Sequence, residues 1–120
     1  TLSCEQGQLR IPYLGKAKII TQRFCTNARG TELLSASCIE KKCSAFRSKV
    51  EINLSQMYSN RGTPGFHLCH QLGGTPQIVD IAVQGRWQRL DRCLFHDDQS
   101  FVDTGTLIAY YLRQYRTRSD

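Results

Sequence analysis

The most regular pattern of apolar and polar positions lies near the C-terminal end of the chain. Apolar residues recur there at spacings of three and four, which predicts a single apolar stripe along an α-helix. The stripe consists of Leu107, Ile108, Tyr111, Leu112 and Tyr115. Asp103 or Thr104 can cap this helix, because a side-chain oxygen at that position accepts a hydrogen bond from a free backbone N–H of the first turn.

Four other stretches predict strands, because they are rich in β-branched and aromatic residues or hold short apolar runs. They form two pairs, residues 18–25 with 31–37 and residues 77–83 with 86–95. Residues 27–30 predict a turn within the first pair, and Gln84-Gly85 predicts a two-residue turn within the second. The sequence therefore predicts two antiparallel hairpins.

The segment between the two hairpins carries two further patterns. Residues 49–54 alternate between apolar and polar side chains, which predicts a half-buried strand. Thr63 can cap a short helix that has Pro64 at its first position and Gly73-Gly74 after its end. Residues 59–65 contain Gly and Pro, and we expect them to form a loop that leads into this helix.

Length and composition indicate one domain. A chain of 120 residues, of which 40% are apolar, is long enough for one modest core. We expect an N-terminal half over residues 1–58 and a C-terminal half over residues 66–116, joined by the Gly/Pro loop. The predicted fold class is α+β, a small disulfide-stapled domain of antiparallel β-hairpins with a short central helix and a C-terminal helix. No apolar stretch approaches the roughly 20 residues of a transmembrane helix.

Six cysteines are many for a cytosolic chain of this size. An even number in a small chain predicts three disulfides, and disulfides persist in oxidising compartments. The expected location is therefore secreted or periplasmic, with a lipid anchor to the envelope as an alternative. Spacing alone does not choose among the many pairings that six cysteines allow.

The charge of the chain is the next indication of function. Sixteen basic and ten acidic residues give a formal net charge of +6. A basic surface favours acidic partners such as nucleic acid, anionic lipid, lipopolysaccharide or acidic proteins. Charge that serves only solubility is the alternative. Arg113, Arg116 and Arg118 cluster near the C-terminus, where cations also stabilise the last turn of a helix.

Residues 69–112 follow a recognisable layout. The segment contains, in order, Cys69, Leu72-Gly73-Gly74, a predicted hairpin, Arg92-Cys93-Leu94-Phe95, a polar turn at Asp97-Asp98-Gln99-Ser100 and a hydrophobic stretch. This layout resembles the hemolysin-like domain of small bacterial lipoproteins, a family of unknown function. The chain departs from the family at Gln99, where glycine is usual, and it has no cysteine after Cys93.

The resemblance implies a bacterial envelope location and a Cys69–Cys93 disulfide, and no functional residue carries over from it. Such a disulfide would tie the short helix to the second hairpin. For the other four cysteines, the most local solution is favoured, with Cys4–Cys25 and Cys38–Cys43. Cys25–Cys38 together with Cys4–Cys43 is the main alternative.

Three histidines lie close in sequence to the cysteines of that implied disulfide: His67, His70 and His96. If Cys69 and Cys93 are joined, His70 and His96 can approach each other, and a histidine pair can act as acid and base in RNA cleavage. Histidines that merely flank a disulfide are the alternative.

Patterns of metal sites and common hydrolases do not emerge. The spacing of histidine and cysteine around Cys69 and Cys93 does not match a zinc finger or ribbon. Asp97-Asp98 fits a turn better than a calcium site. The sequence contains neither a Gly-x-Ser-x-Gly elbow nor a phosphate-binding glycine loop. We therefore expect no cofactor and no metal.

The return strand of the second hairpin is the candidate recognition surface. It interleaves Arg86, Arg89 and Arg92 with Trp87, the only tryptophan of the chain. A tryptophan exposed beside arginines is a common anchor of binding surfaces and can stack on a base or a sugar. A core position for Trp87 is the alternative.

Together these patterns predict a non-enzymatic binding module of the bacterial envelope or secretome. Its expected contact residues are Arg86, Trp87, Arg89, Arg92, Arg113 and Arg116. The expected partner is a protein or an anionic envelope component or polymer, and nucleic acid also fits the charge. Two alternatives come from other classes: a small secreted hydrolase such as a ribonuclease that uses the histidines, and a secreted effector or inhibitor of another protein.

Overall fold

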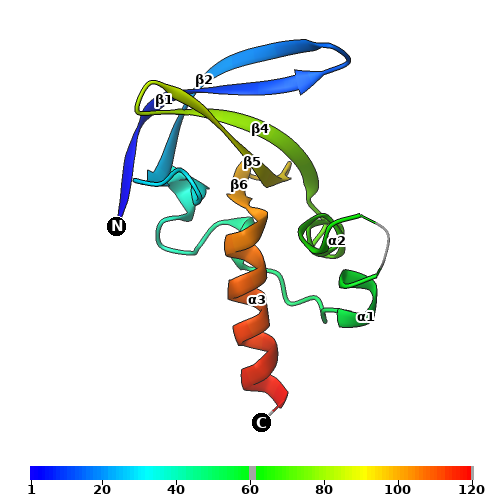
Figure 1. Ribbon diagram of the computed structural model, residues 1–120. Coiled ribbons are helices and arrows are strands. Elements are labelled where there is room, and N and C mark those ends of the chain that lie inside the picture. Colours follow the sequence, from blue (N-terminus) through cyan, green and yellow to red (C-terminus); the bar gives the residue numbers. More distant parts are fainter. Residues whose placement is uncertain (60–61, 120) are drawn as a thin grey trace.

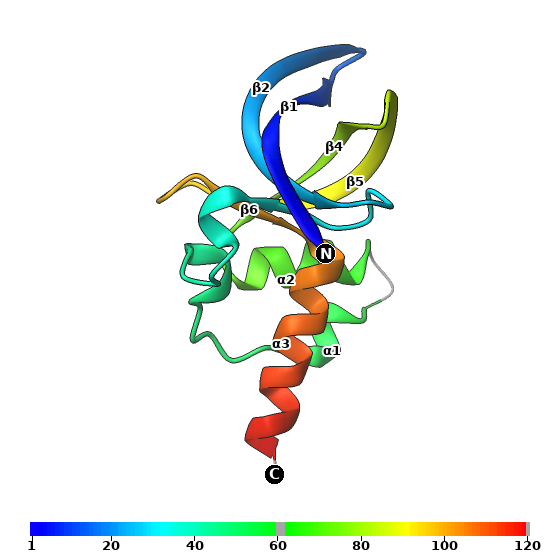
Figure 2. The ribbon, with the colours of Figure 1, turned by 90° about the vertical axis from the view of Figure 1, so that its left-hand side faces the viewer.

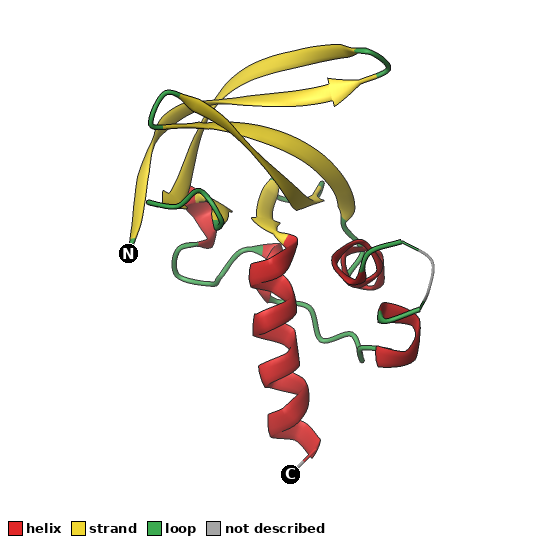
Figure 3. Ribbon diagram, in the orientation of Figure 1, coloured by secondary structure: helices red, strands yellow, loops and turns green. Residues whose placement is uncertain are grey.

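The computed structural model describes residues 1–59 and 62–119, with side chains through Tyr115. Six strands and three helices make up most of this part of the chain (Figures 1 and 3). The strands are β1 (Leu2–Tyr13), β2 (Lys16–Asn27), β3 (Leu33–Ser35), β4 (Thr75–Val83), β5 (Arg86–Phe95) and β6 (Ser100–Asp103). The helices are α1 (Leu54–Met57), α2 (Pro64–Gln71) and α3 (Thr104–Ser119), with single 3-10 turns at Ala36–Cys38 and Ser44–Phe46.

The strands form one closed barrel in the order β1-β2-β3-β6-β5-β4. Each half of the chain contributes an antiparallel meander of three strands, and the two meanders join where β1 pairs with β4 and β3 pairs with β6. The β1–β4 pairing comprises only Leu9↔Ile81 and Arg10↔Asp80. Beyond these pairs the two long hairpins separate, and their tips point to opposite sides of the molecule in Figure 1. Figure 2 shows the two hairpins apart from each other above the helices.

Apolar side chains are buried in two places. One cluster fills the barrel with Leu9, Phe24, Leu33, Val79, Ile81 and Phe101. The second cluster lies between the barrel and the helices, and it includes Phe46, Met57, Leu68, Val102, Leu107 and Tyr111. Because α3 packs its apolar stripe on this second cluster, the helices lie at one end of the molecule and the hairpin tips at the other (Figure 1).

Several local predictions are confirmed. The Gln84-Gly85 turn has φ values of 50° and 77°, the left-handed pair that a two-residue hairpin turn needs. The Thr63 side chain accepts from the Phe66 N–H at the start of α2, and Asp103 accepts from the Thr106 N–H at the start of α3. The three disulfides join Cys4 to Cys25, Cys38 to Cys43 and Cys69 to Cys93. This is the favoured pairing.

The N-terminal half differs from the sequence prediction in two places. The strand expected over residues 49–54 is wrong, because the hydrogen bonds of Asn53 in this segment join side chains to backbone groups and do not pair it with a neighbouring strand. Asn53 caps α1 by accepting from the Gln56 N–H, and its own N–H donates to the Gln71 side chain. The first strand, β1, was not expected at all. The α+β description is therefore only partly right, since most strands belong to a single closed barrel.

Candidate binding surface on the hairpin arms

The outer face of the barrel carries a row of side chains where the two long hairpins meet. We refer to residues 8–23 and 80–89 as the hairpin arms. In the registers of the sheet, Ile19 is opposite Arg10, Arg10 is opposite Asp80, and Asp80 is opposite Arg89. Directly opposed residues point to the same face of a sheet. The row therefore spans all four strands of the arms.

Asp80 is the centre of this row. It is 2% exposed, and it is covered by the guanidinium groups of its two neighbours. Arg89 Nε donates to Oδ1 of Asp80 over 2.9 Å, and Arg10 Nε donates to Oδ2 over 2.9 Å. The hydrogen bonds from Arg89, and then those from Arg10, hold the pKa of Asp80 below its usual value although burial opposes this. Asp80 is therefore an ionised support that fixes two arginines.

Trp87 lies on the same face, two residues before Arg89. The guanidinium carbon of Arg10 is 4.4 Å from the centre of the Trp87 ring, which is a cation–π contact. Trp87 is 38% exposed and belongs to neither apolar cluster. The alternative of a core tryptophan is therefore wrong. Among the described residues no hydrogen bond reaches the Nη nitrogens of Arg10, so these donors remain available to a ligand.

Charge on the hairpin arms is strongly one-sided. They carry six basic residues, Arg10, Lys16, Lys18, Arg23, Arg86 and Arg89, and one acidic residue, the buried Asp80. Between Glu5 and Glu32 the chain has no acidic residue. Like charges gathered on one end of a protein raise the local concentration of anions. This absence of acids is a sequence signal that could have pointed to the first hairpin as well as the second.

The predicted contact residues do not form one surface. Trp87 and Arg89 lie on the outer face of β5, whereas Arg86 and Arg92 are an odd number of residues away from them and lie on its opposite face. Arg86 is exposed near the hairpin tip, but Arg92 is 3% exposed and points into the barrel. Its Nε and Nη2 donate to Oε1 of Gln77, and it stacks on the Phe101 ring. Burial lowers the pKa of Arg92 to about 10. Arg92 is therefore a structural side chain and not part of an exposed surface.

The basic C-terminal end is separate from the arms. Arg113 is exposed on α3, whose far end lies at the opposite side of the molecule from the hairpins (Figure 1). The side chain of Arg116 lies outside the described residues. Sequence reasoning also missed Arg10 and Asp80, because β1 was not recognised and Asp80 has the appearance of an ordinary polar position in an alternating strand.

The three histidines are divided between two pockets. His67 and His70 line one shallow pocket beside α2, whereas His96 lines another beside Ser44 and Asp97. His96 Nε2 is 3.0 Å from the Thr75 hydroxyl. In the described ranges no group of three or more His, Cys, Asp and Glu side chains could hold a metal.

Asp97 and Asp98 serve the fold. The Asp97 carboxylate accepts from the Ser44 hydroxyl over 2.7 Å, and Asp98 accepts from the Ser44 N–H over 2.8 Å. Burial opposes ionisation of Asp98, but hydrogen bonds from Ser100 and Ser44 lower its pKa to about 2. The turn therefore pins the segment after Cys43 to the barrel with both carboxylates.

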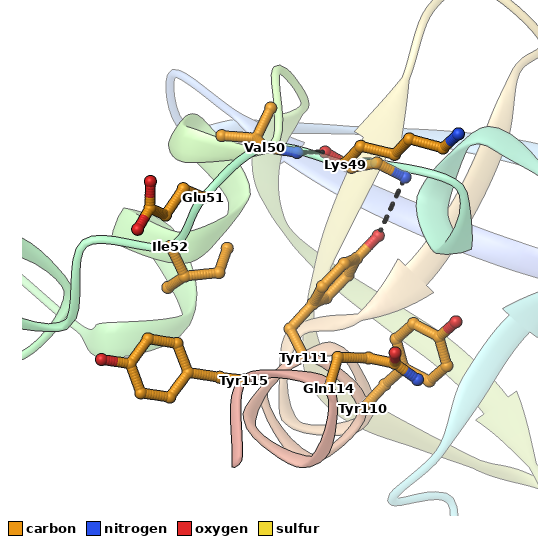
Figure 4. A pocket seen from close by; sticks show the side chains of 9 residues that line it. Lys49, Val50, Glu51, Ile52, Tyr110, Tyr111, Gln114 and Tyr115 are labelled. Atoms are coloured by element: carbon orange, nitrogen blue, oxygen red, sulfur yellow. Dashed lines mark hydrogen bonds between the residues drawn. The ribbon is translucent and has the colours of Figure 1, made fainter. Parts of the chain in front are cut away.

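A pocket of about 410 Å³ lies between α3 and the chain before α1 (Figure 4). It is lined by residues 48–52 and by Tyr110, Tyr111, Gln114 and Tyr115. The Tyr111 hydroxyl donates to the Ala45 carbonyl over 2.6 Å and accepts from the Ser48 N–H over 3.3 Å. Burial raises the pKa of Tyr111 to about 12. The charged groups of Lys49 and Glu51 point away from this hydroxyl in Figure 4.

Substituting Tyr111→Phe is expected to lower the free energy of unfolding by about 1–2 kcal/mol, because the Ala45 carbonyl loses its donor. Urea unfolding of the variant and the wild type measures the difference. Tyr110→Phe is the matched control, because its hydroxyl donates to the Phe46 carbonyl over 3.4 Å only. A larger loss for Tyr110→Phe than for Tyr111→Phe would contradict this assignment.

Comparison with protein-family models, curated proteins and solved structures finds no match to this chain. The resemblance to the hemolysin-like lipoprotein domain therefore stays a prediction. None of the helices in the described residues is long and apolar enough to cross a membrane. Three disulfides are compatible with a protein that folds in an oxidising compartment.

Proposed function

We propose that this protein is a non-enzymatic binding module that contacts an anionic partner through its hairpin arms. The observation that carries the proposal is the arginine pair held by Asp80, with Arg10 stacked on a half-exposed Trp87. Fixed guanidinium groups lose little freedom on binding and suit the planar oxygens of carboxylates and phosphates. The location that accompanies this proposal is the bacterial envelope or secretome.

The chemistry of the arms supports binding better than catalysis. Asp80 has both oxygens occupied by arginines and is covered by them, so it is unsuited to proton transfer. The histidines on which the hydrolase alternative depends line separate pockets elsewhere. What the arms offer is positive charge, guanidinium donors and one aromatic face, which are the elements of anion recognition.

Removing two charges from the arms is expected to weaken polyanion binding strongly. In Arg86→Gln/Arg89→Gln, Asp80 keeps Arg10 as its partner, so the fold should persist. We expect binding to a short duplex DNA, used only as a polyanion of known charge density, to fall about tenfold at low salt. The slope of log K against log salt should shrink by about 2. Fluorescence anisotropy across a salt series measures both quantities.

The control variant removes the same charge at the other end of the molecule. Arg47→Gln/Lys49→Gln changes two exposed residues of the segment near α3. If the arms form the contact surface, this variant should bind within about twofold of the wild type. Equal losses in the two variants would show that only net charge matters, and they would overturn the proposal. No loss in the arm variant would overturn it as well.

A further inference from the structure

The tip of the β1–β2 hairpin exposes apolar side chains that the fold does not use. Tyr13 is 70% exposed and Leu14 is 84% exposed. Neither belongs to an apolar cluster, and the tip projects on its own at one side of the molecule (Figure 1). Ile19, on the outer face of the same hairpin, is 53% exposed. Several large apolar side chains exposed on one hairpin indicate a contact surface.

Leucine is also an unfavourable residue for the backbone conformation at position 14. It has a φ of +48° and is followed by Gly15 at +76°, so the turn is of the two-residue type that favours Asn or Gly at its first central position. A leucine in the left-handed region is strained. The other long hairpin has the same kind of turn but places the polar Gln84 at φ +50°. Neither the turn conformation nor packing in the core explains a leucine at position 14. The side chain of Leu14 therefore indicates a role other than stabilising the fold.

The residues around the tip identify the chemistry of what it contacts. Lys16 and Lys18 follow the tip directly, and Arg10 lies four residues before Leu14, about 13 Å back along the strand. No acidic residue occurs between Glu5 and Glu32. An apolar tip, a tyrosine and then a zone of cations match the layers of a bilayer surface, from acyl chains through the interface to anionic headgroups.

We propose that the Tyr13-Leu14 tip inserts into the interface of a lipid bilayer that contains anionic lipids. This inference rests on the proposed function and specifies the partner of the arms as a membrane surface. Leu14 enters the boundary of the acyl chains and Tyr13 lies at the headgroup level. Lys16, Lys18 and Arg10 bind the lipid phosphates, since an anionic surface attracts cations that lie within a Debye length of it.

The test uses Leu14→Asn, which separates binding from folding. Asparagine suits a positive φ better than leucine does, so the melting temperature should not fall. The probe is phosphatidylcholine vesicles with about one third phosphatidylglycerol, which supply the negative surface. Removing the apolar anchor should lower the vesicle partition coefficient about tenfold or more. Gln84→Asn is the matched control at the other tip and should leave vesicle binding unchanged.

A fluorescence experiment reports insertion directly. Trp87 is the only tryptophan, so Trp87→Phe gives a dark background for Leu14→Trp. Addition of the anionic vesicles should shift the emission of the new tryptophan to shorter wavelength, and pure phosphatidylcholine vesicles should have little effect. An unshifted emission on bound protein would overturn the insertion.

The outcomes distinguish this inference from the proposed function. Leu14→Asn should bind duplex DNA as the wild type does, because no charge has changed. Wild-type protein that binds DNA but not anionic vesicles would overturn the bilayer as partner and leave the anionic binding module intact. Equal vesicle binding by Leu14→Asn and wild type would overturn the anchor in the same way. Failure of the proposed function would be recognised by a different result, namely unchanged DNA binding of Arg86→Gln/Arg89→Gln across the salt series.

Discussion

Replacing Cys69 and Cys93 together by alanine is expected to lower the free energy of unfolding by about 3–4 kcal/mol. The disulfide between them closes a loop with a sequence separation of 24 and ties α2 to β5. Both cysteines are fully buried in the cluster between the barrel and the helices. Without the bridge, the unfolded chain gains the freedom that the closed loop had removed. Urea unfolding monitored by circular dichroism measures the loss.

Cys38→Ala/Cys43→Ala is the control for this expectation. These cysteines are also buried in the same cluster, but their bridge has a sequence separation of only 5. The chain-entropy argument gives a smaller loss for it, about 2 kcal/mol. Because both double variants remove two buried sulfurs, the difference between them isolates the effect of loop length. A loss for the short bridge that equals or exceeds that for the long one would contradict the argument.

Local features of this fold could be predicted because each is encoded within a few residues. Thr63 with Pro64 marks the start of α2, and Gln84-Gly85 marks a turn, since each depends only on its own backbone and side-chain chemistry. The residue 49–54 prediction failed for the opposite reason. Alternation is necessary for a half-buried strand, but Asn53 and Gln71 show that side chains far apart in sequence can satisfy the backbone without a sheet.

Barrel closure could not be predicted, because it depends on few contacts between distant residues. β1 meets β4 through two residue pairs about 70 positions apart, and β3 meets β6 through the single pair Leu34↔Val102. β3 and β6 have three and four residues, which is too short for a periodic pattern. The contribution of β1 to the binding surface could not be predicted for the same reason. Arg10 reaches Asp80 and Trp87 only once β1 closes the barrel.

Burial and exposure within the second hairpin were likewise decided by the barrel. Arg86, Trp87 and Arg89 were predicted as one surface with Arg92, because they share a strand. The strand continues from the arms into the closed part of the barrel, where the face that carries Arg92 is covered by Gln77 and Phe101. Alternation in the sequence shows which residues of a strand share a face, but it does not show how far along the strand that face is exposed to solvent.

A substitution in the Gly73-Gly74 pair beside the Cys69–Cys93 bridge is also expected to lower the free energy of unfolding strongly. A Cβ on Gly74 would collide with Cys93 Sγ, and it would lie 3.1 Å from Cys69 Sγ and 3.2 Å from the Leu94 carbonyl oxygen. Gly74→Ala is therefore expected to lower the free energy of unfolding by about 2–3 kcal/mol through overpacking. A Cβ on Gly73 meets nothing within 4 Å, but its φ of +88° strains any side chain. Gly73→Ala should cost about 1 kcal/mol.

A double-mutant cycle separates these two causes. In the Cys69→Ala/Cys93→Ala background the sulfurs that crowd Gly74 are gone, so the cost of Gly74→Ala should fall by about 1 kcal/mol or more. The cost of Gly73→Ala should stay the same, because backbone strain does not depend on the bridge. An unchanged cost for Gly74→Ala would show that the Leu94 carbonyl, and not the disulfide, excludes a side chain there. If the expected coupling is found, the spacing of cysteine, glycine pair and second cysteine has a steric cause, since the second glycine of the pair is the residue against which the disulfide packs.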